Sequence, residues 1–143
     1  MKKFSILMAA LALAACEPPM PTAPDEADAT GRQFSAPPTG MAALYVYGRS
    51  AKINIAANRL MLGDVMRKYW LRADLPPGRY DLRCVGVGLE LASNNLVVDL
   101  QPGQTVFVSV GADFWRGACD MVIESPTVAQ PAILAGKRVR ELN

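Results

Sequence analysis

Three cysteines are the residues of this sequence best suited to covalent chemistry, and the sequence contains no histidine to assist them. Cys16 follows an apolar N-terminal run, whereas Cys84 and Cys119 lie in the second half of the chain. Without histidine, the chain lacks the usual general base, the commonest metal ligand and every Ser-His or Cys-His pair. We therefore expect cysteine to carry an attached group or a disulfide, and we expect the protein to be no enzyme and to hold no metal.

The first 15 residues are typical of a cleaved signal peptide, because two lysines precede an apolar run at residues 4–15. At a rise of about 1.5 Å per residue, this run is too short to cross the roughly 30 Å hydrocarbon core of a membrane. The sequence LAAC at residues 13–16 resembles the bacterial lipobox. This resemblance implies cleavage before Cys16 and a covalent lipid on its thiol. An ordinary secretory signal followed by a chance cysteine is the alternative.

The resemblance to the lipobox also implies an attachment to a membrane. Two or three acyl chains, palmitate among them, hold a protein on a bilayer stably, whereas one chain does so only marginally. Glu17 follows Cys16 in place of the aspartate that favours inner-membrane retention in enteric bacteria. We therefore expect the periplasmic side of the outer membrane, and apart from the lipid on Cys16 we expect no cofactor.

The charge of the chain gives no support to nucleic-acid binding. Removal of the two leader lysines leaves 15 − 2 = 13 Lys and Arg against 13 Asp and Glu in the remaining chain. A protein that binds a polyanion usually carries a clear excess of positive charge. We expect no nucleic-acid partner.

Residues 16–39 contain six prolines and few large apolar side chains. Such a segment buries too little apolar surface to offset the entropy of ordering it. The composition predicts an extended, semi-rigid tether between the lipidated Cys16 and the folded domain. A proline-rich ligand for a groove-shaped domain is the alternative interpretation of this segment.

Residues 40–143 are expected to form an all-β domain, a small antiparallel β-sandwich of about seven or eight strands. Apolar residues alternate with polar ones over short runs, and turn residues recur roughly every ten positions. Asn58 suits a tight turn, and Pro-Gly pairs at residues 77–78 and 102–103 suit two more. After the last expected strand, residues 131–142 follow a helical spacing, so we expect a short C-terminal helix that begins at Pro131.

Cys84 and Cys119 both lie in expected strands and remain as an even pair once Cys16 is lipidated. In an oxidising compartment, such a pair favours a structural disulfide. Two buried free thiols, or a pair too far apart to join, are the alternatives.

Aromatic residues near expected loops are the candidates for binding. Tyr69 and Trp70 form one pair, and Phe114 and Trp115 form another. Exposed aromatic side chains stack on sugars and anchor protein partners. The alternative is that these rings fill the core and close the ends of the sandwich.

Several segments resemble a known family. They are APPTG at residues 36–40, ALYVY at 43–47, LPPGRY at 75–80 and LQPGQTVFV at 100–108. Together they resemble small bacterial lipoproteins built around an uncharacterised domain, similar to PEGA-type β-sandwich modules. The resemblance covers about residues 32–143. It implies an immunoglobulin-like or PEGA-like sandwich, and it implies no catalytic residues.

The sequence leaves three hypotheses for the function. The first is a non-catalytic, lipid-anchored envelope protein that binds or braces another envelope protein. The second is a peptidoglycan-binding or carbohydrate-binding module on a lipid tether. A hydrolase that uses the carboxylates Asp113, Asp120 and Glu124 is the least favoured, because acids scattered in one region are usually solvated.

Overall fold

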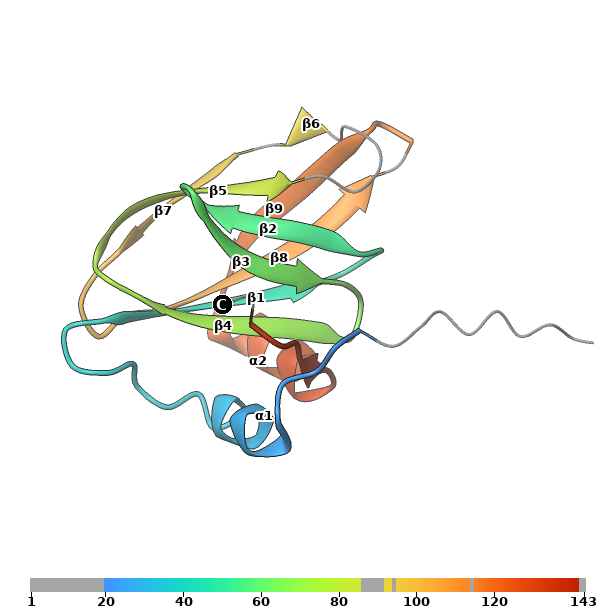
Figure 1. Ribbon diagram of the computed structural model, residues 1–143. Helices are drawn as coiled ribbons and strands as arrows, with labels where there is room; N and C mark the ends of the chain where they lie inside the picture. The colour runs from blue at the N-terminus through green and yellow to red at the C-terminus, as the bar shows by residue number, and fades with distance from the viewer. Residues whose placement is uncertain (1–19, 86–91, 94, 114, 142–143) are drawn as a thin grey trace, which may run out of the picture.

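Two β-sheets stack to form the domain, as a computed structural model that describes residues 20–85, 92–93, 95–113 and 115–141 shows (Figure 1). One sheet has the strand order β10-β4-β1-β8-β9-β6 and the other the order β3-β2-β5-β7. The first sheet contains β1 (Ala42–Gly48), β4 (Tyr69–Leu75), β6 (Ala92–Ser93), β8 (Thr105–Asp113), β9 (Ala118–Glu124) and β10 (Lys137–Arg138). The second contains β2 (Ile53–Ala57), β3 (Leu60–Val65), β5 (Gly78–Val85) and β7 (Leu96–Leu100). The expectation of an all-β sandwich is therefore confirmed.

The main core lies between the two sheets, where strand alternation brings one face of each sheet inward. From β1 the inward residues are Ala42, Leu44 and Val46, and they pack with Ile53 and Ile55 of β2. The predicted turn after β2 is also present, because Asn58 adopts a positive φ of 54°. Asparagine tolerates this left-handed conformation at low cost.

The larger sheet is mixed and not antiparallel throughout, which corrects the sequence expectation. β1 pairs with β4 in antiparallel fashion but with β8 in parallel. A parallel pair needs a long crossover connection, and the whole of β2 to β7 supplies it here. Alternation of apolar residues shows which side chains face inward, but it carries no information on the direction of the neighbouring strand.

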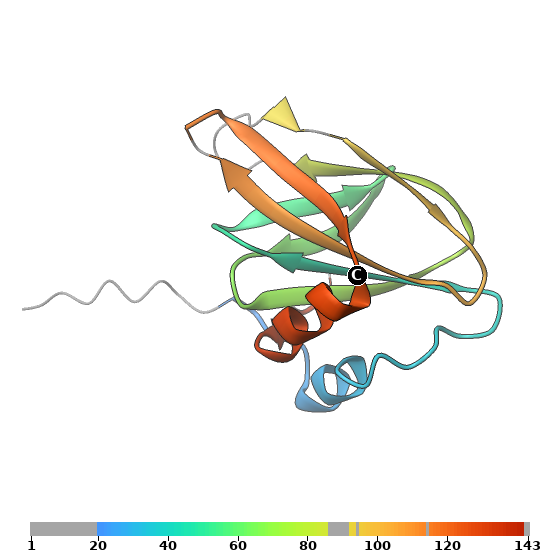
Figure 2. The ribbon, with the colours of Figure 1, turned by 180° about the vertical axis from the view of Figure 1, so that it is seen from behind.

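Helices form a third layer on the outer face of the larger sheet (Figures 1 and 2). This layer contains α1 (Asp25–Gly31) and α2 (Pro126–Leu134). A second apolar cluster lies beneath it, formed by Ala43, Tyr45, Tyr47, Trp70, Phe107, Ala129 and Ile133, with Phe34 packed against it. All seven residues of β1 are buried as a result, because this strand has a covered face on each side.

The N-terminal segment differs from the predicted tether, because residues 20–39 are packed onto the domain. Met20 and Ala23 are buried, and Thr22 forms an antiparallel bridge with Val139 beside β10. The Phe34 ring lies 5.5 Å from the Tyr45 ring, measured between centroids. Composition alone underestimated the packing of this segment, because a few apolar side chains are enough to hold it against the domain.

Arginines fix the N-terminal segment in place. Arg32 pairs with Asp28 at 2.6 Å and donates to the carbonyl oxygens of Leu134 and Gly136, so it joins α1 to the end of α2. Arg138 donates through its backbone N–H to Asp28 Oδ1 at 2.6 Å and through its guanidinium to the Ala27 carbonyl at 3.0 Å. Hydrogen bonds to charged groups contribute more than neutral ones, so these contacts stabilise the docked segment.

The C-terminal helix starts earlier than expected. It begins at Pro126 and ends at Leu134, with Pro131 inside it, whereas Lys137 and Arg138 belong to β10. Both prolines suit a first helical position, and the sequence does not tell which of them starts the helix. Gly136 then allows a close approach, because a Cβ atom there would lie 2.8 Å from the Lys68 carbonyl oxygen.

Candidate binding surfaces

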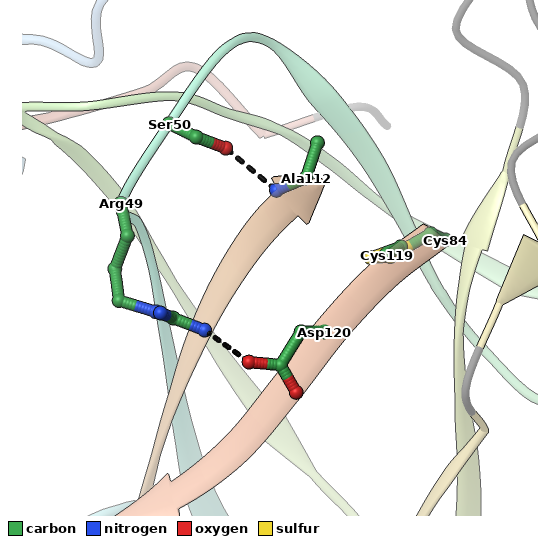
Figure 3. The surroundings of a disulfide bond; sticks show 6 residues. All are labelled: Arg49, Ser50, Cys84, Ala112, Cys119 and Asp120. Atoms are coloured by element: carbon green, nitrogen blue, oxygen red, sulfur yellow. Dashed lines mark hydrogen bonds and ion pairs between the residues drawn. A yellow bond between two sulfur atoms is a disulfide. The ribbon is translucent and has the colours of Figure 1, made fainter. Parts of the chain in front are cut away.

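Cys84 and Cys119 form a disulfide that joins the two sheets (Figure 3). Cys84 lies on β5 and Cys119 on β9, and their Cα atoms are 6.4 Å apart. Both side chains belong to the main core or pack against it. The bond therefore fixes the start of β9 relative to the smaller sheet, and the predicted pairing of these cysteines is confirmed.

Polar contacts support the same end of the larger sheet (Figure 3). Arg49 pairs with Asp120 at 2.8 Å between Nη2 and Oδ2. The Ser50 hydroxyl accepts a hydrogen bond from the backbone N–H of Ala112 at 2.6 Å. These contacts tie the connection after β1 to the β8–β9 hairpin, whose stem also carries the disulfide.

Trp115 stands at the tip of the β8–β9 hairpin and is 99% exposed. The Asp113 carboxylate holds the tip by accepting the backbone N–H groups of Trp115 and Arg116 at 3.1 and 3.2 Å. Gly117 completes the turn with a φ of 60°. A large aromatic side chain is thus presented to the surroundings on a local scaffold of hydrogen bonds, which suits an anchoring role.

The other aromatic candidates take different positions. Trp70 is fully buried under the helical layer and contacts Tyr45 with a centroid distance of 5.8 Å, so its side chain is not available for binding. Tyr69 is half-buried and packs against the main core. The burial of Trp70 could not be predicted from the sequence, because the helices α1 and α2 that cover it come from distant parts of the chain. Phe114 and Cys16 lie outside the described residues.

The scattered carboxylates make structural contacts. Asp113 caps the hairpin tip, Asp120 pairs with Arg49, and Glu124 accepts a hydrogen bond from the Ser109 hydroxyl at 2.9 Å. Each therefore has a partner that accounts for its position. These contacts do not support the hydrolase hypothesis, which requires two carboxylates that face one cleft.

Two tyrosines of β1 have raised pKa values. Burial is the main cause for Tyr45, and the nearby Arg72 guanidinium, which donates to the Tyr45 hydroxyl at 3.0 Å, opposes the rise in pKa. Burial is also the main cause for Tyr47, and the Glu124 carboxylate raises its pKa further. The Tyr45 hydroxyl donates to the Gly31 carbonyl at 2.9 Å, which makes it a contact between the sheet and α1.

The outer edge of β9 is an apolar surface that the sequence analysis did not single out. β6 pairs with β9 only at Ala118 and Cys119, so within the described ranges residues 120–124 have no strand on that side. Val122 and Ile123 on this stretch are 41% and 51% exposed. We call residues 120–124 the β9 edge. Three consecutive apolar residues near the end of the strand, Met121, Val122 and Ile123, are the signal that could have pointed to it.

Metal binding and membrane spanning find no support in the described part of the chain. No group of three or more cysteine, aspartate or glutamate side chains there is arranged to hold a metal ion. Among those same residues, no helix is long and apolar enough to cross a membrane.

Comparisons with known proteins do not assign the chain to a family. No protein-family model, curated protein or solved structure matches it.

Proposed function

We propose that the protein is a cell-envelope lipoprotein without catalytic activity. A lipid on Cys16 holds it at the periplasmic side of the outer membrane, and its sandwich domain binds or braces another envelope protein. The lipobox-like residues 13–16 support the anchor. The inter-sheet disulfide supports an oxidising compartment such as the periplasm, where bonds of this kind persist.

The β9 edge is the single observation that favours a protein as the partner. An uncovered strand edge offers backbone N–H and C=O groups to a strand of another chain. Natural sheets usually protect such edges with charged residues. Asp120 and Glu124 flank this edge, but Val122 and Ile123 between them are exposed. A partner strand that pairs with residues 120–124 would cover both the polar backbone and the apolar side chains.

Photo-cross-linking in the native host tests the partner. A photoactivatable side chain at Val122 is expected to give one recurring protein adduct. The same probe at Leu60, which is 51% exposed on β3 of the other sheet, serves as the matched control. Equal adduct patterns from the two positions, or no protein adduct from Val122, would contradict the proposal.

A peptidoglycan-binding or carbohydrate-binding module is the second candidate, and Trp115 favours it. A fully exposed indole on a hydrogen-bonded tip suits stacking on a sugar ring. This hypothesis expects the mature protein to co-sediment with cell-wall sacculi and the Trp115→Ala variant to remain in solution. Sedimentation that Trp115→Ala leaves unchanged would count against it.

We also propose that the domain is a PEGA-like sandwich of the uncharacterised lipoprotein family. The supporting segments are residues 36–40, 43–47, 75–80 and 100–108. Two of them, 75–80 and 100–108, hold the turns before β5 and β8. An experimental structure that superimposes on a PEGA-type module strand by strand would support this assignment, and a different strand order would overturn it.

A further inference from the structure

Several connections meet at one end of the sandwich. β1 and β8 run parallel, and both finish there. β4 is antiparallel to β1, and β2 is antiparallel to β3, so the β1–β2 and β3–β4 connections lie at that end together with the Trp115 hairpin tip (Figure 1). We call this the loop end, defined by residues 49–52, residues 66–68 and Trp115. The turn at residues 101–104 lies at the opposite end, beside the start of β1.

The described chain also starts at the loop end. Met20 and Pro21 line one surface pocket together with Asp64 of β3 and with Val139 and Arg140. Figures 1 and 2 both show the first described residues on the side of the β3–β4 connection.

Little chain separates Cys16 from this start. Cys16 precedes Met20 by four residues, and four residues span at most about 14 Å even when they are fully extended. A lipid on Cys16 would therefore keep the loop end close to the bilayer. The predicted tether to residue 39 would have allowed a much greater distance, but residues 20–39 are packed on the domain.

The loop end and the adjoining strand β10 are strongly basic. Residues 49–52, 64–68 and 137–140 contain seven arginines and lysines and one carboxylate, Asp64. Two of the arginines are paired with carboxylates just outside these ranges, Arg49 with Asp120 and Arg138 with Glu141. Lys52 pairs with Asp64 at 2.8 Å, whereas Arg67, Lys68 and Lys137 are exposed to the surroundings. The backbone N–H of Lys137 donates to the Lys68 carbonyl at 2.9 Å, so these two lysines belong to one patch.

Trp115 adds an apolar contact of the kind that membrane interfaces accept. Tryptophan is enriched where the headgroups meet the acyl chains, because its ring is amphipathic. The indole is fully exposed at the hairpin tip, and the adjacent Arg116 is 85% exposed. Basic residues around an exposed tryptophan favour an anionic lipid surface.

We propose that the loop end lies flat on the anionic bilayer that holds the lipid of Cys16. The lipid, the basic patch and the Trp115 indole then contact the membrane together, and the β9 edge stays open to a partner at the side of the domain. This inference rests on the proposed lipid anchor and specifies how the anchored domain is oriented.

Energy transfer from a labelled protein to lipid headgroups tests the orientation. The mature lipidated protein, carrying one donor label at Ala51→Cys or at Gln101→Cys, is placed in vesicles of phosphatidylethanolamine and phosphatidylglycerol with acceptor-labelled headgroups. Seven residues of β1 separate the two ends by about 23 Å. We expect strong transfer from position 51 and weak transfer from position 101.

Charge reversal tests the role of the basic patch. Lys68→Asp with Lys137→Glu is expected to lower the transfer from position 51. The matched control, Arg59→Glu with Arg79→Glu, changes the same net charge at the opposite end and is expected to leave the transfer unchanged. Trp115→Ala is expected to lower it as well. High salt, which screens exposed charges, is expected to reproduce the loss seen with the lysine variant.

The outcomes separate the two proposals. A protein that carries no lipid by mass would contradict the proposed anchor itself. Lipidated protein with equal transfer from both labels, or with stronger transfer from position 101, would contradict only the orientation. Transfer that falls equally in the lysine variant and in its control would overturn the basic patch as the contact.

Discussion

Cys84 and Cys119 connect strands that belong to different sheets, so their bond holds the two sheets together in the fold. In the unfolded state the same bond restricts the conformations of the chain. Closing a loop of 35 residues is expected to stabilise the folded state by about 3–4 kcal/mol in the chain-entropy model. We predict that Cys84→Ala with Cys119→Ala lowers the free energy of unfolding by about this amount, as measured by urea denaturation.

The wild-type protein under reducing conditions is the control for this prediction and should lose a similar amount. A thiol assay of the mature protein in denaturant without reductant should detect no free thiol. A loss below about 1 kcal/mol would contradict a stabilising role, because it is smaller than the range typical of native disulfides.

The buried tyrosines predict a loss of stability at alkaline pH. Tyr45 and Tyr47 have pKa values above the ordinary value of about 10, because burial disfavours the phenolate. A raised pKa in the fold means that the native state binds the proton more tightly than the unfolded state does. The contribution is therefore complete below pH of about 10 and is lost as the pH rises through the folded-state pKa.

Ultraviolet titration of the phenolate checks this prediction. Tyr45 and Tyr47 are expected to titrate above pH of about 10 in the native protein, and Tyr45→Phe is expected to remove one late transition. Late transitions that Tyr45→Phe leaves unchanged would show that another residue causes them.

At the residue scale, the chemical role of a side chain was easier to predict from the sequence than its exposure to solvent. The cysteine pair followed from an even count in a secreted context, and its geometry agrees with that prediction. Trp70 and Trp115 could not be told apart in this way, because both follow or precede polar loops in the sequence. Trp70 is fully buried because helices from distant parts of the chain cover it, whereas Trp115 is 99% exposed at the tip of a hairpin.

The docked N-terminal segment is the main feature at the scale of the elements. Arg32 contacts Asp28 and the carbonyls of Leu134 and Gly136, so it holds α1, α2 and the start of β10 together. We predict that Arg32→Ala lowers the free energy of unfolding by about 1–3 kcal/mol, since the Asp28 carboxylate and two backbone carbonyls would lose the Arg32 donor. Chemical denaturation measures the change.

The neighbouring substitution Gln33→Ala is the matched control, because Gln33 is exposed. Its effect is expected to stay within about 0.5 kcal/mol, as for most surface substitutions. Equal effects of the two substitutions would contradict a specific role of Arg32 in docking the segment.

A substitution at the β9 edge is expected to abolish binding of the partner while it leaves the stability of the domain almost unchanged. Ile123→Lys places a charge on the exposed edge and is expected to abolish the protein adduct from a photoactivatable side chain at Val122. The free energy of unfolding should change by only about 0.5 kcal/mol, because Ile123 is 51% exposed. An adduct that survives Ile123→Lys would contradict recognition by strand pairing.

Strand positions were the most predictable elements, because period-two runs and turn residues coincide at β1, β5, β7 and β8. Strand partners were less predictable, since the parallel pairing of β1 with β8 depends on a crossover of the whole middle of the chain. α1 was missed under the proline-rich composition. Pro24 followed by Asp25, Glu26 and Asp28 in the first turn was its signal, because negative charge suits a helix N-terminus.

At the scale of the whole molecule, the larger sheet is the middle of three layers. Helices cover its outer face, the smaller sheet covers its inner face, and the chain starts at the end where Trp115 and the basic patch lie. Residues 20–23 already pack on the domain, so the proposed lipid on Cys16 would hold the domain next to the bilayer and not at the end of a long tether. In the proposed orientation, the exposed β9 edge would face sideways, where a neighbouring envelope protein would have access to it.

The lipid on Cys16 is the claim on which this arrangement depends. Mass spectrometry of the N-terminal peptide of the mature protein, purified from membranes of its own host, tests it most directly. The account predicts a chain that begins at Cys16 and carries a diacylglyceryl thioether, and predicts that Cys16→Ser leaves the precursor unprocessed. A mature chain that begins at another residue, or one with an unmodified Cys16, would contradict the account.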